Sequence, residues 1–200
     1  GEKGDTGAKG DTGKDGLGFS QENVTFLNDL KNSGITANYL KNLQSFLKID
    51  SSKKLLTVTG ANLQITNGSN QTDSTNGFGN LIIGYNKTRT GTNPTKTGSH
   101  NLVIGDGHEF TSYAGIVSGA NNTISGKAAL ALGGQFNTSS GQYAVSLGGG
   151  GKSLGDGLKA SGSYSVITGG TGSTASGSSS VITGGTGSTA SGSFSVITGG

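Results

Sequence analysis

The stretch from residue 160 to residue 200, "ASGSYSVITGGTGSTASGSSSVITGGTGSTASGSFSVITGG", decides the fold class. Ala160, Ala175 and Ala190 lie 15 residues apart and begin nearly identical units. Self-similarity at a fixed period is typical of proteins built from stacked structural repeats, because each repeat buries its apolar residues against its neighbours. The sequence therefore predicts a repeat architecture rather than a conventional globular domain.

The same phrase recurs with variation from Asn80 onward, as "NLIIG", "NLVIG", "GIVSG", "ALALG", "AVSLG" and then "SVITG". Successive phrases are 14, 15 or 21 residues apart, and in seven of the eight a second glycine precedes the closing glycine by seven residues. Glycine favours tight turns, so each coil reads as strand, turn, strand, turn, with coils about 4.8 Å apart. We predict a mainly β fold, a parallel β-roll or solenoid, over residues 77–200.

The two faces of these strands carry different residues. The first position of each phrase is always aliphatic, and because side chains alternate along a strand, we expect this column to fill the coil interior: Leu81, Leu102, Ile116, Leu130, Val145, Val166, Val181 and Val196. The middle position points the opposite way, yet six of its eight members are large and apolar: Ile82, Val103, Val117, Ile167, Ile182 and Ile197. Strands that are apolar on both faces are buried on both. We therefore predict that the middle column is a trimer interface.

The N-terminal part has a different composition. Residues 1–16 read "GEKGDTGAKGDTGKDG", with glycine at every third position, namely Gly1, Gly4, Gly7, Gly10, Gly13 and Gly16. This period is typical of a collagen triple helix, so we predict a collagen-like stalk over 1–18; a flexible charged linker is the alternative. Apolar residues at three- and four-residue spacings predict two short helices forming a trimeric neck over 19–50. Alternating apolar residues predict a β transition over 51–76.

Composition excludes several classes of protein. The 14 Lys and Arg residues are scattered along the chain and the net charge is only +3, which gives no support to nucleic-acid binding. The absence of cysteine excludes disulfides and thiolate metal sites. No stretch approaches the length of a transmembrane helix, so we expect no membrane insertion of this segment. The sequence opens inside one repeat type and ends inside another, and we expect it to be part of something longer.

Residues that could carry chemistry are few. The motif "GDGHEF" places Asp106, His108 and Glu109 together, which is a weak metal or acid-base pattern, and we expect these side chains to lie solvated in a turn. "LGDGLK" lacks the repeated Asp of calcium-binding nonapeptides. We therefore predict no catalytic residue, no metal, no cofactor and no enzymatic activity. If the segment binds a ligand, we expect the binding residues in the loops at 85–100 and 149–164.

The pairing of "ASG" with "SVITG" resembles the β-roll heads of trimeric autotransporter adhesins. The matching residues are Ala160, Gly162, Ser165, Val166, Ile167 and Gly169, and again Ala175, Gly177, Ser180, Val181, Ile182 and Gly184. The resemblance covers about residues 77–200 and implies a left-handed β-roll in a homotrimeric fibre that projects from a cell surface. The 15-residue period, the threonine in the third strand position and the collagen-like tract depart from that family.

Two further interpretations stay open. Collagen-like sequence joined to β-structured segments also resembles the trimeric tail fibres of phages and injection machines. A monomeric solenoid that binds ice or polysaccharide through a threonine array, Thr168, Thr183 and Thr198, is the other interpretation. We expect these threonines to face inward, which argues against it. For the fibre, we expect an extracellular location, self-association, and a host-cell, matrix or glycan receptor as the outside partner, if there is one.

Overall fold

The computed structural model describes residues 28–29, 31–33, 37–89, 91 and 95–200. It divides into two compact units, Gly1–Leu63 and Gln64–Gly200. The collagen-like glycines, Gly1 to Gly16, lie outside the described residues. Most of the first predicted helix lies outside them as well, with helical backbone at 28–29 and 31–32.

The first unit contains a helix and a β-hairpin. Helix α2, Ala37–Phe46, leads directly into strand β1, Leu47–Asp50, which pairs antiparallel with β2, Leu55–Val58. The carboxylate of Asp50 accepts hydrogen bonds from the backbone N–H groups of Ser52 and Lys53 and from the Ser52 hydroxyl, and so closes the turn. The second predicted helix is thus confirmed as far as Phe46, but residues 47–50 are strand rather than helix.

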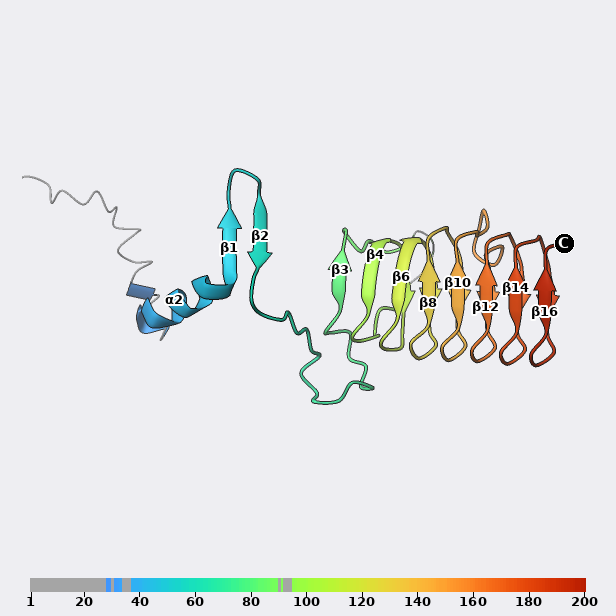
Figure 1. Ribbon diagram of the computed structural model, residues 1–200, viewed down its shortest axis with the longest axis horizontal. Helices are drawn as coiled ribbons and strands as arrows, with labels where there is room; N and C mark the ends of the chain where they lie inside the picture. Colours follow the sequence, from blue (N-terminus) through green and yellow to red (C-terminus); the bar gives the residue numbers. More distant parts are fainter. Residues whose placement is uncertain (1–27, 30, 34–36, 90, 92–94) are drawn as a thin grey trace, which may run out of the picture. The chain divides into compact units, whose positions relative to one another are not determined.

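The second unit is a parallel β-solenoid of about six turns, as the sequence predicts. Figure 1 shows the long strands side by side along the stack. The eight-stranded sheet contains β3 Leu81–Ile83, β4 Leu102–Asp106, β6 Ile116–Ala120, β8 Leu130–Leu132, β10 Val145–Leu147, β12 Val166–Thr168, β14 Val181–Thr183 and β16 Val196–Thr198. The six-stranded sheet contains β5 Glu109–Phe110, β7 Thr123–Ile124, β9 Thr138–Ser139, β11 Lys159–Ala160, β13 Thr174–Ala175 and β15 Thr189–Ala190.

Every strand of the solenoid pairs in register with the equivalent strand of the next coil. Val145 lies beside Val166, for example, and Val166 lies beside Val181. Glycine at the turns allows this close stacking. A Cβ added to Gly162 would lie 2.1 Å from the carbonyl oxygen of Gly177, so only glycine lets these two coils approach here.

The interior of the coils holds the middle column and not the first column. The prediction that the first column fills the interior and the middle column forms a trimer interface was therefore wrong. Val103, Val117, Ile167 and Ile182 are fully buried within the single chain. At the two ends of the sheet, Ile82 is 42% exposed and Ile197 is partly buried against the core. None of these six residues forms an outward trimer interface.

The predicted core column faces outward instead. Its members are half-buried or exposed: Leu81, Leu102, Ile116, Leu130, Val145, Val166, Val181 and Val196. Because side chains alternate along a strand, the third position faces outward with the first. Thr168 is half-buried and Thr183 and Thr198 are exposed, so the prediction that these threonines face inward was also wrong.

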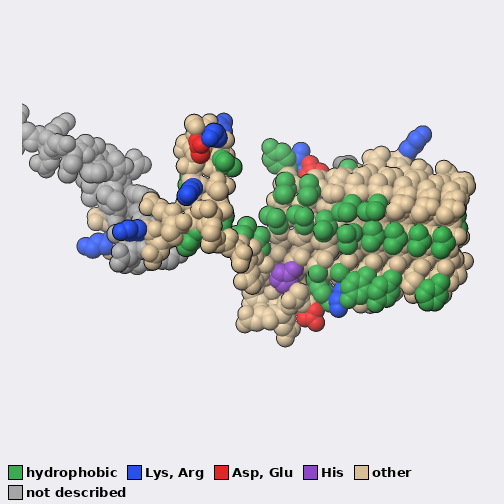
Figure 2. All heavy atoms as spheres, viewed as in Figure 1, with side chains coloured by type: hydrophobic (Ala, Val, Ile, Leu, Met, Phe, Trp, Pro, Cys, Tyr) green, Lys and Arg blue, Asp and Glu red, His purple; other side chains and the backbone are tan. Residues whose placement is uncertain are grey.

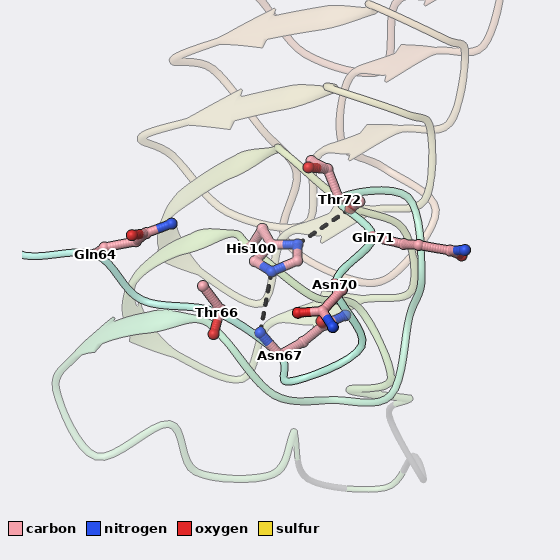
Figure 3. A pocket seen from close by; sticks show the side chains of 7 residues that line it. All are labelled: Gln64, Thr66, Asn67, Asn70, Gln71, Thr72 and His100. Carbon is pink, nitrogen blue, oxygen red and sulfur yellow. Dashed lines mark hydrogen bonds between the residues drawn. The ribbon is translucent and has the colours of Figure 1, made fainter.

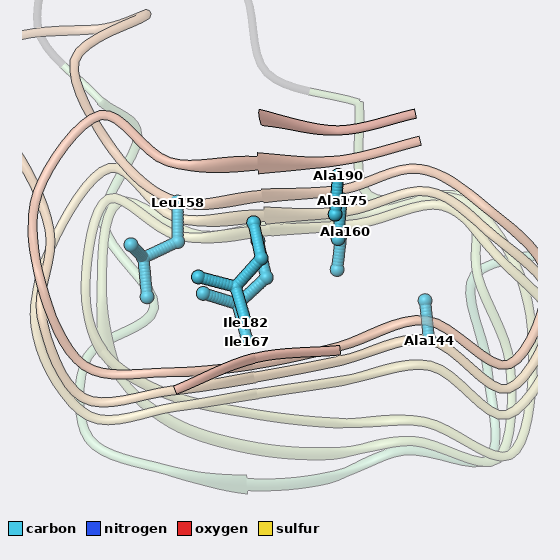
Figure 4. Packing of buried hydrophobic residues seen from close by; sticks show 7 residues of the cluster. All are labelled: Ala144, Leu158, Ala160, Ile167, Ala175, Ile182 and Ala190. Carbon is cyan, nitrogen blue, oxygen red and sulfur yellow. The ribbon is translucent and has the colours of Figure 1, made fainter. Parts of the chain in front are cut away.

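The interior is thin, and this explains the reversal. Ile167 and Ile182 point from the eight-stranded sheet toward the short side chains of Ala160 and Ala175 on the other sheet (Figure 4). In the coil of β9 and β10, Ser139 donates a hydrogen bond across the interior to the Ser146 hydroxyl at 2.9 Å. A space this narrow accepts small residues, so a column that contains alanine and serine can be the buried one.

Candidate functional site

The outward face of the eight-stranded sheet is the most extensive candidate site. We call it the outer sheet face; it consists of the first and third positions of the long strands. Its residues are Leu81, Ile83, Leu102, Ile104, Ile116, Ser118, Leu130, Leu132, Val145, Leu147, Val166, Thr168, Val181, Thr183, Val196 and Thr198. None of them is charged, and most are aliphatic. Figure 2 shows hydrophobic side chains in rows along the stack.

The outer sheet face is broad enough to act as an interaction surface. Eight strands about 4.8 Å apart extend about 34 Å, and three residues span about 10 Å, so the face covers roughly 340 Å². Patches of this size rank with the largest apolar patches of monomeric proteins, and such patches are often functional. Exposure is highest near the ends of the sheet, with Ile83 at 52% and Val196 at 64%.

His108, which the sequence placed in a weak metal or acid-base pattern, is buried and fully engaged. The backbone N–H of Asn122 donates to its Nδ1 at 3.2 Å, so Nε2 carries the proton and donates to the carbonyl of Ile104 at 3.0 Å. Burial lowers the pKa of His108, and the nearby guanidinium of Arg89 lowers it further. The ring is therefore a neutral structural group, and the expectation that it lies solvated in a turn was wrong for His108.

Arg89 fastens residues 85–89 to the same corner of the solenoid. Its side chain is 4% exposed and donates from Nε to the carbonyl of Gly107 at 3.1 Å and from an Nη to the carbonyl of Asn121 at 2.6 Å. Glu109 lies 3.8 Å from it and balances the charge. A buried guanidinium is tolerated only with such partners. Asp106 accepts a hydrogen bond from the backbone N–H of Lys87 at 2.9 Å, so both acidic residues of the motif hold this loop in place.

His108 belongs to a column that precedes each short strand, which we call the corner column. It continues as Asn122, Asn137, Leu158, Ser173 and Ser188. The Oδ1 of Asn122 accepts from the backbone N–H of Asn137, and Asn137 accepts from Leu158 in the same way. The sequence carried a signal for this ladder, because Asn122 and Asn137 lie one period apart and each precedes a threonine.

Among the hollows on the described residues of the second unit, two adjoin segments that the sequence singles out. The first, about 290 Å³, is lined by the amide side chains of Gln64, Asn67, Asn70 and Gln71 together with His100 (Figure 3). The ring of His100 is engaged there: Nε2 accepts from the backbone N–H of Asn67, and Nδ1 lies 3.1 Å from the carbonyl oxygen of Thr72. This histidine therefore fixes the 66–72 segment.

The second hollow borders the 149–164 loop, one of the two loops in which we expect binding residues if the segment binds a ligand. It is about 410 Å³ and open, and it is lined by Lys152, Gly155, Asp156, Thr171, Gly172, Thr186 and Gly187. Asp156 accepts a hydrogen bond from the Ser153 hydroxyl at 2.5 Å, within the loop itself. The two loops singled out in the sequence thus do different things: the 85–100 loop supplies structural contacts, and the 149–164 loop borders an open hollow.

Within the described part of the chain, no group of three or more His, Asp or Glu side chains could hold a metal ion. The helices described there are too short or too polar to cross a membrane. Comparison with protein-family models, curated proteins and solved structures finds no match for this chain. The parallel β-solenoid is therefore established by the structure, and the likeness to adhesin β-rolls rests on the repeat alone.

Proposed function

We propose that this chain is a structural and adhesive segment of an extracellular homotrimeric fibre, with a collagen-like stalk, a helical neck and a β-solenoid. The observation that carries the proposal is the outer sheet face, which is mostly aliphatic and is free of charge over all eight strands. A second and a third copy of the chain are the partners that fit it. The strict glycine period of residues 1–16 independently favours three chains, because a collagen triple helix needs glycine at every third position.

Association through the outer sheet face would be driven by burial of aliphatic side chains. Removing apolar surface from water contributes about 25 cal/mol per Å², so a face of roughly 340 Å² per chain contributes several kcal/mol. Standard protein interfaces bury about 800 Å² per partner, so the neck and the stalk supply the remaining contacts. In this arrangement the polar six-stranded side faces solvent and keeps the fibre soluble.

The threonine-array solenoid is the second candidate, and one observation favours it. Thr168, Thr183 and Thr198 lie in register on neighbouring strands and face outward, so they form a regular row of hydroxyls. A regular hydroxyl row is the kind of array that binding to ice or to a flat polysaccharide requires. The row occupies part of the outer sheet face, so the same surface cannot serve both functions. The trimeric tail-fibre interpretation shares the assembly of the first proposal and differs only in origin.

Native mass in solution tests the proposal. Light scattering after size exclusion should give about three times the chain mass of 19.7 kDa. The double variant Leu130→Glu and Val166→Glu puts charge on the outer sheet face and should lower the mass toward that of one chain. Ser161→Glu and Ser176→Glu, on the exposed opposite side, should stay trimeric. Circular dichroism confirms that each variant keeps its β structure.

The other outcomes each have a definite meaning. A monomeric wild-type chain contradicts the fibre proposal, and an ice-recrystallisation assay of that monomer then tests the threonine array. A Leu130→Glu and Val166→Glu variant that remains trimeric shows that the chains associate through another surface.

A further inference from the structure

A column of residues in left-handed backbone conformation runs along one edge of the solenoid. These residues lie two positions before each long strand, and we call them the edge column. Its members have φ between 49° and 60°: His100, Ala114, Ala128, Tyr143, Tyr164, Ser179 and Phe194. The backbone N–H groups of Tyr164, Ser179 and Phe194 donate to the preceding coil at 2.8, 2.8 and 2.9 Å, so these residues stay in register.

Aromatic rings fill the edge column in three of its last four coils. The rings of Tyr143 and Tyr164 stack, with centroids 5.1 Å apart and an angle of 23° between their planes. The distance between the centroids is close to the spacing of neighbouring coils. Ser179 follows and then Phe194, so the aromatic column is interrupted for one coil. The side chains of Tyr164 and Phe194 are 56% and 78% exposed. Figure 2 shows hydrophobic side chains along the lower edge of the stack as well, where the long strands of Figure 1 begin.

The interruption has the height of one ring. Tyr164 and Phe194 are two coil steps apart, which is about 10 Å. An additional ring placed above Ser179 would therefore lie about 5 Å from each of the two aromatic side chains, the same spacing as in the Tyr143 and Tyr164 stack. The other end of the stack is occupied, because the ammonium of Lys127 lies 5.9 Å from the centre of the Tyr143 ring.

The chemistry around the gap selects the kind of ring. Residues 160–200 contain no charged side chain, so an ionic ligand would find no counter-charge there. Hydroxyl and carbonyl groups accompany Ser179 in this coil and the preceding one: the neighbouring Ser178 hydroxyl donates a hydrogen bond of 3.5 Å to the carbonyl of Ser163, and Ser179 itself is half-buried. A neutral sugar matches both features, because its C–H faces pack on aromatic rings and its hydroxyls bond to polar groups at the rim.

We propose that the gap between Tyr164 and Phe194, above Ser179, binds one pyranose ring of a neutral glycan. This site gives a ligand class to the adhesive role proposed above and rests on that role, but it lies within one chain and does not depend on the trimer. In a trimer, three equivalent sites on one fibre would bind a multivalent glycan more tightly than one site, through effective concentration.

Saturation-transfer NMR of the 200-residue chain with maltotetraose, cellotetraose and mannotetraose tests the site. We expect saturable binding of at least one of them, with contacts from one internal sugar ring. Ser179→Tyr fills the gap with a ring that this backbone position already accepts at Tyr143 and Tyr164, so it should weaken binding at least tenfold. Phe194→Ser removes one wall and should do the same. Ala114→Tyr is the matched control, because it adds a tyrosine at the same φ in a distant coil and should leave binding unchanged.

Three results would overturn the site. The first is no saturable binding of any of the three sugars. The second is a Ser179→Tyr variant that keeps its β circular dichroism and binds as the wild type does. The third is displacement of the sugar by adenosine, with an affinity for the site that equals or exceeds that of the sugar. This result would assign the gap to flat aromatic ligands. Native mass is measured on the same samples, so a failed sugar site and a failed trimer are told apart.

Discussion

The coils of residues 95–139 and those of residues 159–200 have the same backbone path but are held together by different side chains. The first set has large core residues, Phe110 and Ile124, and an amide ladder at its corner. The second set has Ala175 and Ala190 in place of the large residues and Ser173 and Ser188 at the corner. The coil therefore requires a filled interior, but no particular residue there or at the corner, where even Leu158 is accepted.

The two sets also differ in how much depends on side-chain hydrogen bonds. Asn122 donates to the carbonyls of Ser118 and Gly133 and accepts from Asn137, so one side chain joins three backbone segments. Ser173 accepts a single long bond of 3.3 Å from the backbone of Ser188. The coils of residues 159–200, which we call the uniform coils, must therefore rely more on backbone ladders and on tight glycine turns. Each of the following substitutions tests one side of this difference.

The largest effect is expected from Gly162→Ala in the uniform coils. The new Cβ would meet the backbone of Gly177 at 2.1 Å, which the ladder can relieve only by separating two coils. We expect a loss of about 3 kcal/mol or more in the free energy of unfolding, measured with denaturant. Gly169→Ala is the matched control: its Cβ meets nothing within 4 Å, and the φ of 75° alone should cost about 1 kcal/mol. Equal losses for both would contradict the tight-turn explanation.

A smaller effect is expected at the corner column. Asn122→Ala leaves two carbonyls and one N–H without their side-chain partner in a buried corner, and we expect a loss of about 2–3 kcal/mol. Ser173→Ala removes one weak acceptor and should cost about 1 kcal/mol or less. Urea unfolding of the two variants against the wild type gives both values. If Ser173→Ala is the more damaging change, the uniform coils depend on the corner as much as the others do.

The smallest effect is a pH dependence from His108. Because its pKa in the folded chain lies below the unfolded value of about 6.5, the folded state binds fewer protons. Stability is therefore complete above about pH 6.5 and falls as the pH drops through that value, by at most about 1.4 kcal/mol per pH unit. His108→Asn should remove this dependence, because Asn122 and Asn137 make the equivalent contacts. Thermal unfolding between pH 7.5 and 5.5 measures it; an unchanged acid sensitivity in the variant would assign it to other groups.

The period, the glycine turns and the parallel stacking could be predicted from sequence because each leaves a regular trace. The inward and outward faces could not, since the choice rested on which column was always aliphatic. Ala131 and Ser146 made the middle column look less buried, yet both are fully enclosed. Only the width of the interior decides which column is buried. That width depends on the size of the residues on the opposite strand, which the repeat period does not reveal.

The edge column and strand β1 show a second limit of prediction from sequence. Glycine marks positive φ in a sequence, but Tyr143, Tyr164 and Phe194 also adopt it, each held by a backbone hydrogen bond to the preceding coil. Aromatic residues in this conformation are uncommon, so no local pattern announces them. Likewise, Leu47–Asp50 continues the apolar spacing of the preceding helix, and its strand conformation comes from pairing with Leu55–Val58. In both cases pairing with another segment of the chain overrides the local preference.

In-register stacking makes the solenoid a molecular ruler. Each coil adds the same rise of about 4.8 Å whatever its loop carries, since the 21-residue coils of β4 and β12 pair with their neighbours as closely as the shorter ones do. Duplication or deletion of a whole repeat would therefore change the reach of the molecule in equal increments while every remaining coil keeps its neighbours. A lineage carrying such a gene could adjust how far the protein extends by recombination between repeats, with no new fold to invent.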